Sequence, residues 1–237
     1  MGLLNLLRKK KTEVRCSAVV LAAGSSNRMG QDKIMLQIQD VPVIVHTLRA
    51  IEAVSEIEEI VVVTREDLIP EIAGLCKIFG IQKVVKIVRG GDSRAESAHI
   101  GVCEVDPEAT LVAVHDAARP FASVELIRTV VLKAAETGAA APAIPVKDTI
   151  KVAYNGLIDH TPDRATLFAV QTPQVFDADL LRAALQKAVE DGAVITDDCS
   201  AVERLGMKVS LTSGDERNIK LTTPADLALA EVIASEV

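Results

Sequence analysis

The chain has 237 residues and a formal net charge of −7, with 49% hydrophobic residues, only 2% aromatic residues and no Trp. This composition argues against nucleic acid binding, because a phosphate backbone attracts positive proteins and single strands stack on aromatic side chains. The length is enough to bury the core of one α/β unit. We therefore expect a single domain over residues 14–237, in which local positive charge holds any bound phosphates.

Residues 1–13, MGLLNLLRKKKTE, place an apolar patch before Arg8 and three lysines. The order does not fit a signal peptide, and the patch is too short to span a bilayer. We expect a flexible extension and no membrane role, the alternative being a weak membrane-surface or partner helix. The four cysteines lie far apart without a C-x-x-C pair. Idle thiols of this kind are typical of a cytoplasmic protein and predict neither a zinc site nor disulfides.

The first predicted strand, residues 18–21, runs into a loop of small residues, LAAGSSNRMGQDK, that carries Arg28 and Lys33. In open α/β sheets ligands bind at the carboxyl ends of strands, where backbone N–H groups of small residues can approach an anion. Neither G-x-x-x-x-G-K-[ST] nor G-x-G-x-x-G is present. The loop predicts a phosphate site outside those two patterns, or else an ordinary strand-to-helix turn with surface charges.

Strand and helix patterns then alternate along the chain. Apolar runs predict strands over residues 57–66, 83–88, 110–116 and 139–146. Helical spacing and capping residues predict helices over residues 42–54, 68–79, 94–104 and 124–137. The pattern resumes with an apolar run at 167–176, a helix capped at Asp177, a short helix near 196–206, a strand at 208–212 and a helix from Thr223. We expect an α/β fold with a Rossmann-like, mostly parallel twisted sheet and helices on both faces.

One segment breaks this alternation. Residues 148–152 and 157–161 flank an Asn155-Gly156 pair, which is a strong hairpin signal. The hairpin has too few large apolar residues to fold alone. We expect a protruding β-arm at about residues 145–165 that packs against a second subunit in a homodimer.

Charged residues occur where the predicted strands end: Arg28 and Lys33, Asp92 and Arg94, Asp116 and Arg119, and Lys220 before the last helix. The carboxyl ends of parallel strands share one sheet edge, so these groups are expected to meet there. The cations suit a polyphosphate, and Asp116 suits Mg²⁺ that bridges phosphate oxygens. Each residue alone could equally be a cap or a surface ion pair.

The sequence has no evident Ser-His-Asp or Cys-His set, and His115, beside Asp116, is interpreted as structural rather than as a catalytic base. A reaction in which a substrate phosphate attacks needs no side-chain nucleophile. The protein would only align that phosphate and stabilise charge on the phosphoryl oxygens. This reasoning predicts nucleotidyl transfer.

Eight segments in chain order resemble the 2-C-methyl-D-erythritol 4-phosphate cytidylyltransferases: LAAGSSNRMG…DK, GGDSRAES, VHDAARPF, DTIK, TPDR, QTPQVF, TDDCSAVE and NIKLTTPADL. The similarity runs from about Val14 to the end. It implies that CTP and 2-C-methyl-D-erythritol 4-phosphate give 4-diphosphocytidyl-2-C-methyl-D-erythritol and pyrophosphate in a Mg²⁺-dependent homodimer. The Ile34-Met35 pair after Lys33 departs from the Gln-Tyr or Gln-Phe of many members, and the extension is not part of the pattern.

The resemblance also implies roles for individual residues. Binding of the CTP triphosphate falls to Ala22, Ala23, Gly24, Arg28 and Lys33, with Arg28, Lys33 and Lys220 catalytic at the transition state. The cytidine positions are Gly91, Asp92, Arg94 and Ser97 at the base and Ala117 at the ribose. The positions for metal, substrate phosphate and methylerythritol phosphate are Asp116, Arg119, Thr149, Arg164, Thr172 and Lys220. Thr149 and Arg164 would reach the neighbouring site on the arm.

Two other functions stay open at this point. A ribitol 5-phosphate cytidylyltransferase would share the fold, the loop and the lysines and would differ in the alcohol phosphate it accepts. A non-catalytic nucleotide-binding regulator would keep the loop but has no need of Lys33 or Lys220, both of which are present.

Overall fold

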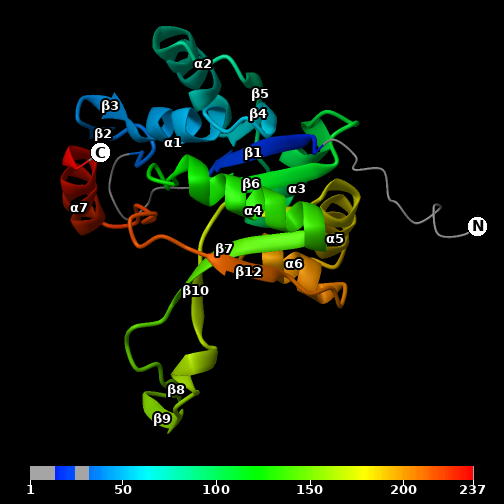
Figure 1. Ribbon diagram of the computed structural model, residues 1–237, viewed down its shortest axis with the longest axis vertical. Helices are drawn as coiled ribbons and strands as arrows, with labels where there is room; N and C mark the ends of the chain where they lie inside the picture. The colour runs from blue at the N-terminus through cyan, green and yellow to red at the C-terminus, as the bar shows by residue number, and fades with distance from the viewer. Residues whose placement is uncertain (1–13, 25–31, 237) are drawn as a thin grey trace, which may run out of the picture.

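The computed structural model describes residues 14–24 and 32–236, so the predicted flexible extension and Arg28 lie outside the described residues. The main sheet has eight strands in the order β10-β7-β11-β6-β1-β4-β5, with β12 beside β7 (Figure 1). Its strands are β1 Cys16–Ala22, β4 Ile57–Thr64, β5 Val84–Arg89, β6 Leu111–Asp116, β7 Ala139–Pro145, β10 Phe168–Val170, β11 Gln174–Asp177 and β12 Ser210–Ser213.

Most neighbours in this sheet run parallel. Strands β6, β1, β4 and β5 are mutually parallel, and β12 is parallel to β7. Strand β11 lies antiparallel between β6 and β7, and β10 pairs antiparallel with β7. The predicted apolar run at 167–176 is therefore two strands, interrupted at Pro173, which has no N–H to donate to a ladder.

Helices cover both faces, as predicted. The first face carries α1 Val43–Glu52, α2 Ile69–Phe79, preceded by the short helix η1 Glu66–Leu68, and α4 Val124–Thr137. The second face carries α3 Arg94–Glu104, α5 Ala178–Glu190 and α6 Asp198–Arg204. Successive residues of β1 alternate between the two cores, with Ala18 and Val20 in one and Val19 in the other.

Three predicted helix starts are confirmed by their hydrogen bonds. Ser123 accepts from the Leu126 N–H, and Asp177 accepts from the Asp179 and Leu180 N–H groups. The last helix, α7 Pro224–Ser235, begins with a capping box between Thr223 and Asp226. These side chains satisfy N–H groups that the first turn of a helix leaves without partners.

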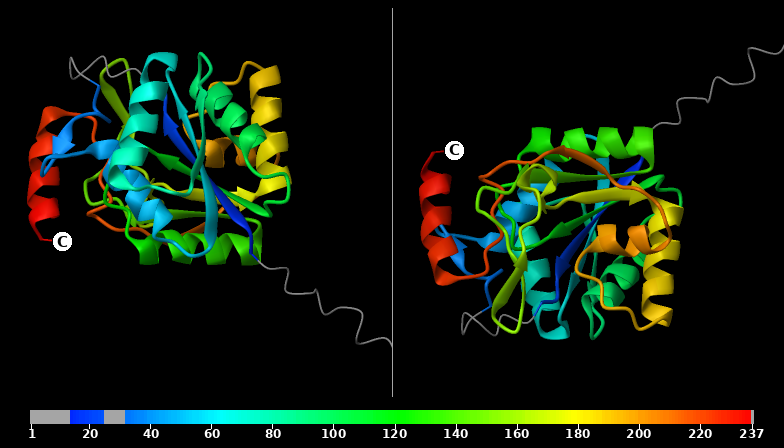
Figure 2. Two further views of the ribbon diagram at one scale, coloured as in Figure 1. Left: turned by 90° about the horizontal axis from the view of Figure 1, so that it is seen from above. Right: turned by 90° about the horizontal axis from the view of Figure 1, so that it is seen from below.

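A small hairpin was not predicted. Strands β2 Gln37–Ile38 and β3 Val41–Pro42 precede α1, which begins at Val43. Helix α7 packs beside this hairpin at one end of the molecule (Figure 2), where Ile38 and Ala230 share a third buried cluster. Strands of two residues are too short to produce a periodic signal.

Residues 146–167, called the arm below, leave the sheet after β7 and return at β10 (Figure 1). The arm holds β8 Val152–Tyr154, β9 Leu157–His160 and the short helix η2 Arg164–Thr166. Its two strands form a separate antiparallel sheet. Asn155 and Gly156 take φ values of 51° and 81° at the turn, which confirms the predicted hairpin.

Candidate active site

A cavity of about 410 Å³ lies at the carboxyl ends of β1 and β6. The predicted residues that line it are Ala22, Ala23, Gly24, Lys33, Gly91, Asp92, Arg94, Ser97, Asp116 and Lys220. They come from the first loop, the segment after β5, the end of β6 and the approach to α7. The predicted convergence at one sheet edge is therefore confirmed for the described residues.

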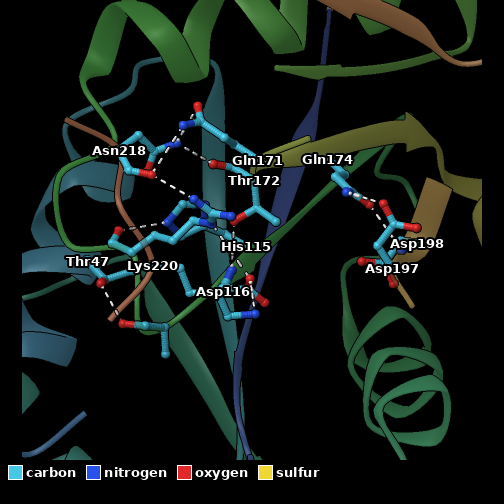
Figure 3. Close-up of polar contacts among 12 residues, drawn as sticks. Thr47, His115, Asp116, Gln171, Thr172, Gln174, Asp197, Asp198, Asn218 and Lys220 are labelled. Atoms are coloured by element: carbon cyan, nitrogen blue, oxygen red, sulfur yellow. Dashed lines mark hydrogen bonds and ion pairs between the residues drawn. The ribbon is translucent and has the colours of Figure 1, made fainter. Parts of the chain in front are cut away.

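Asp116 lies where the positive groups meet. Its carboxylate is 2.8 Å from the Lys220 ammonium and 3.7 Å from the Arg119 Nε (Figure 3). Arg119 also donates from Nη1 to the Asn218 carbonyl at 2.6 Å. Burial alone would raise the pKa of Asp116, but Lys220, with Arg94 and Arg119 beyond it, lowers that pKa below its ordinary value. The cavity thus holds an ionised carboxylate against a lysine.

His115 is buried, and its ring is held at both nitrogens. Its Nε2 faces the Arg119 carbonyl at 3.1 Å, so this nitrogen carries the proton. The Thr172 hydroxyl donates to Nδ1 at 3.0 Å and accepts from the Asp116 N–H at 3.1 Å. Burial lowers the pKa of His115 to about 4, which keeps the ring neutral. These bonds agree with the interpretation of His115 as a structural residue. They also link Thr172 to His115 and to Asp116.

The second wall of the cavity is built around Arg94. Its two terminal nitrogens donate to Asp198 at 3.0 and 2.7 Å, and the Asp198 side chain is fully buried. Burial opposes the charge of Arg94, but the Asp198 carboxylate raises the pKa of the guanidinium above its ordinary value. Ser93 caps α3 by accepting from the Glu96 N–H. Sequence reasoning missed Asp198, although it lies in the quoted TDDCSAVE segment.

Five predicted residues that the structure describes lie outside the cavity lining: Ala117, Arg119, Thr149, Arg164 and Thr172. Arg119 and Thr172 contact Asp116, which does line the cavity. Ala117 is buried, with its N–H bonded to the Leu21 carbonyl, and its neighbour Ala118 lines the cavity instead. Thr149 and Arg164 are exposed on the arm, where Arg164 donates to the Lys147 carbonyl at 3.0 Å. Because Thr149 and Arg164 do not line the cavity of their own chain, any role in a binding site would need contacts outside that cavity.

The described residues hold no group of three or more His, Cys, Asp or Glu side chains that could ligate a metal ion by itself. Asp116 and Asp92 are the carboxylates that line the cavity. Mg²⁺ commonly binds one or two carboxylates and completes its shell with water and substrate phosphates. The donor set therefore fits Mg²⁺ that arrives with a polyphosphate and not a metal held by protein ligands alone.

Among residues 14–24 and 32–236, none of the helices is long and apolar enough to cross a membrane.

All four cysteines are free thiols. Burial raises the pKa of Cys16 to about 12, so this thiol stays protonated.

An α/β sheet with a cationic cavity and a buried carboxylate at its strand ends is suited to binding a nucleotide, and the family comparison identifies the chain as a nucleotidyltransferase. The family model described as IspD, 2-C-methyl-D-erythritol 4-phosphate cytidylyltransferase, matches residues 16–236. The chain therefore belongs to this family.

Individual relatives agree with the family model. The cytidylyltransferase of that name from Caldanaerobacter subterraneus is 44% identical over 224 residues, which are 91% of this chain and 97% of the relative. Its counterpart from Bacillus cytotoxicus is 43% identical, over 90% of this chain and 95% of the relative.

Solved structures show the same fold. The crystal structure of 4-diphosphocytidyl-2C-methyl-D-erythritol synthase from Anaerococcus prevotii superposes with a TM-score of 0.84 at 31% identity, covering 93% of this chain and 96% of that one. The cytidylyltransferase from Thermus thermophilus gives a TM-score of 0.77 at 32% identity, covering 92% and 98%.

Proposed function

We propose that the chain transfers CMP from CTP to 2-C-methyl-D-erythritol 4-phosphate and releases pyrophosphate. The observation that carries this proposal is the meeting of Lys33 and Lys220, from opposite ends of the chain, in one cavity with Asp116. Membership of the cytidylyltransferase family supports it.

The reaction follows from what the cavity offers. Ser93 and Ser97 line it, but the Ser93 hydroxyl caps α3 and the Ser97 hydroxyl faces the Gly91 carbonyl at 3.4 Å. Neither is held by a base, so the attacking group is the substrate phosphate, in line with the α-phosphorus. The charge that grows on the phosphoryl oxygens is stabilised by Lys33 and Lys220, together with Arg28 from the loop that carries Lys33.

In this proposal the triphosphate and the cytosine of CTP contact different parts of the cavity. Ala22, Ala23 and Gly24 present backbone to the triphosphate, while Gly91, Asp92, Arg94 and Ser97 surround the cytosine, with Ala117 behind the ribose. Asp116 would hold Mg²⁺ together with nucleotide oxygens, and the ion would neutralise phosphate charge. Arg119 and Thr172 stand on the side of the methylerythritol phosphate.

The arm completes the site of a second chain in this proposal. Three of its apolar side chains are widely exposed, Tyr154 at 67%, Leu157 at 75% and Ile158 at 65%. Exposed apolar surface of this kind marks an interaction site. A homodimer with exchanged arms covers this surface and brings Thr149 and Arg164 to the partner's cavity. In this proposal residues 14–237 of each chain form a single domain.

The direct test is pyrophosphate release from CTP with each alcohol phosphate. We expect turnover with 2-C-methyl-D-erythritol 4-phosphate and little with ribitol 5-phosphate. The reverse preference would assign the ribitol enzyme instead. Binding of CTP without pyrophosphate release, with either alcohol phosphate, would identify a nucleotide-binding regulator.

The same assay tests the base. A pocket that reads cytosine through hydrogen bonds leaves groups mispaired when UTP binds, so discrimination against UTP should be large. Equal kcat/KM values for CTP and UTP would contradict this role of the segment from Gly91 to Ser97.

A further inference from the structure

The segment from Gln171 to Gln174, at the junction of β10 and β11, has two buried glutamines that the proposed reaction does not use. Gln171 is 5% exposed and Gln174 is 2% exposed. Three residues apart, their side chains reach two different parts of the active site (Figure 3). Buried amides that make several hydrogen bonds hold what they contact in a defined position.

Gln171 holds the segment that leads to Lys220. Its Nε2 donates to the Asp215 carbonyl at 2.7 Å, and its Oε1 accepts from the Asp215 N–H at 3.1 Å. The side chain thus pairs with the backbone of Asp215 as a second peptide group would. The same amide lies 3.4 Å from the carbonyl and from the side-chain nitrogen of Asn218, two residues before Lys220.

Two further observations show how closely this segment is seated. A Cβ on Gly214 would lie 2.7 Å from the Gln171 Oε1 and 2.9 Å from the carbonyl carbon of Ala143, so only glycine fits there. Asn218 is fully buried and donates to the Thr172 carbonyl at 2.9 Å. Its own carbonyl accepts from Arg119. The Gln171 contacts therefore hold the backbone that leads to Lys220, which pairs with Asp116.

Gln174 holds the opposite wall. Its Oε1 accepts from the N–H groups of Asp198 and Cys199, both at 3.0 Å, at the start of α6. Its Nε2 donates to Asp197 at 2.8 Å, and Asp197 caps the same helix through Ser200. These bonds orient Asp198 toward Arg94, which lines the cavity.

We propose that Gln171 and Gln174 are positioning residues with separate tasks: Gln171 sets Lys220 for the transfer step, and Gln174 sets Asp198 and Arg94 for nucleotide binding. This inference rests on the proposed cytidylyl transfer. It assigns the two halves of one short segment to different kinetic steps. Displacement of a catalytic group by about 1 Å can cost up to about 10²-fold in rate, so the effects are measurable.

The experiment compares Gln171→Met and Gln174→Met, which keep side-chain volume and remove the hydrogen bonds. For Gln171→Met we expect kcat to fall about 10-fold or more, with the KM for CTP and the CTP over UTP preference near wild type. For Gln174→Met we expect the KM for CTP to rise about 10-fold and the base preference to weaken, with a smaller change in kcat. Gln186→Met, an exposed position on α5, is the neutral control.

Calorimetric titration with CTP gives a readout that does not depend on turnover. It should show weakened binding for Gln174→Met only. The melting temperature is recorded for each variant, and Gln171→Asn and Gln174→Asn, which keep an amide, replace any variant that does not fold.

The same kinetic pattern in both folded variants, or wild-type kinetics with a lower melting temperature in both, would overturn the inference. Failure of the proposed function is recognised separately, because wild-type enzyme would then release no pyrophosphate.

Discussion

The active-site edge of the sheet and the arm differ in where their partners are found. At the edge, Asp116, Arg94 and Asp198 are bonded to other residues of the same chain, across up to 104 positions of sequence. In the arm, Leu157 and Ile158 are 75% and 65% exposed, and within the described residues the two strands pair only with each other. The site is thus positioned by contacts within one chain, whereas the arm exposes apolar surface that a second chain would cover in the proposed homodimer.

The largest effect is expected at the sheet edge, from Lys220→Ala. A preorganised charge that acts mainly in the transition state should contribute about 10²-fold or more to kcat. Lys220 is 40% exposed at its side chain, but its removal leaves the buried Asp116 carboxylate without its nearest cation, so the free energy of unfolding should also fall, by about 1 to 3 kcal/mol. Steady-state kinetics and urea denaturation measure the two quantities. Lys187→Ala, which removes a surface pair with Asp191, is the control, and near-normal turnover of Lys220→Ala would contradict the assignment.

The second prediction tests whether the arm acts in another chain. A Lys33→Ala chain and an Arg164→Ala chain, each expected to be nearly inactive alone, are mixed and allowed to exchange subunits. If Arg164 serves the partner's cavity, one site of each mixed dimer has both residues intact. Random exchange makes about half of the dimers mixed, so about a quarter of wild-type activity should return if the sites are independent.

Native mass spectrometry confirms that subunits have exchanged. Exchange without any recovered activity would show that Arg164 serves its own chain, because every site then lacks one of the two residues.

The third prediction concerns the buried histidine of the site. His115 has its pKa lowered from 6.5 to about 4 by burial. Between those pH values the unfolded chain binds a proton that folded His115 does not. His115 therefore contributes stability that is present above pH 6.5 and is lost as the pH falls to 4, of order 3 kcal/mol.

The measurement is the free energy of unfolding by urea at several pH values. The loss of stability from pH 6.5 to 4 should be smaller in His115→Gln than in the wild type. An unchanged pH dependence in His115→Gln would mean that this ring already titrates normally in the folded chain.

The smallest effect concerns two glycines with the same backbone requirement. Gly80 ends α2 with a φ of 69°, and Gly156 forms the arm turn with a φ of 81°. Alanine costs about 1 kcal/mol at such a position. Gly80→Ala should lower the free energy of unfolding by that amount, and Gly156→Ala should leave it unchanged in dilute protein. Equal losses would show that the arm unfolds together with the main sheet.

Local signals were sufficient for much of the fold and for the outline of the site. The caps Ser123, Asp177 and Thr223 act within a few residues, so sequence spacing identified them. The charged part of the cavity lining followed from charged residues at strand ends, because parallel strands share one edge, whereas the small residues of the lining were assigned through the family resemblance. The Asn155-Gly156 turn carried its own backbone preference.

The missing parts depend on contacts between distant segments. The pairing of Arg94 with Asp198 and the clamp of Gln171 on Asp215 join residues 104 and 44 positions apart. The placement of β11 between β6 and β7 is equally non-local. Ala118 lines the cavity where Ala117 was predicted. This difference depends on the backbone conformation of the turn after β6, which residue type alone does not determine.

The place of β11 also bears on the order in which the chain can fold as it is synthesised. Strands β1, β4, β5 and β6 lie within residues 16–116 and can pair as they emerge from the ribosome. Strand β7 follows, but β11 alone joins it to β6, and the whole arm is made before β11. Until Gln174–Asp177 are synthesised, β6 keeps an unpaired edge and no strand joins β7 to β6 by hydrogen bonds. The arm is therefore synthesised while the edge of β6 is still unpaired. Any chain that stops short of β11 exposes that edge to aggregation.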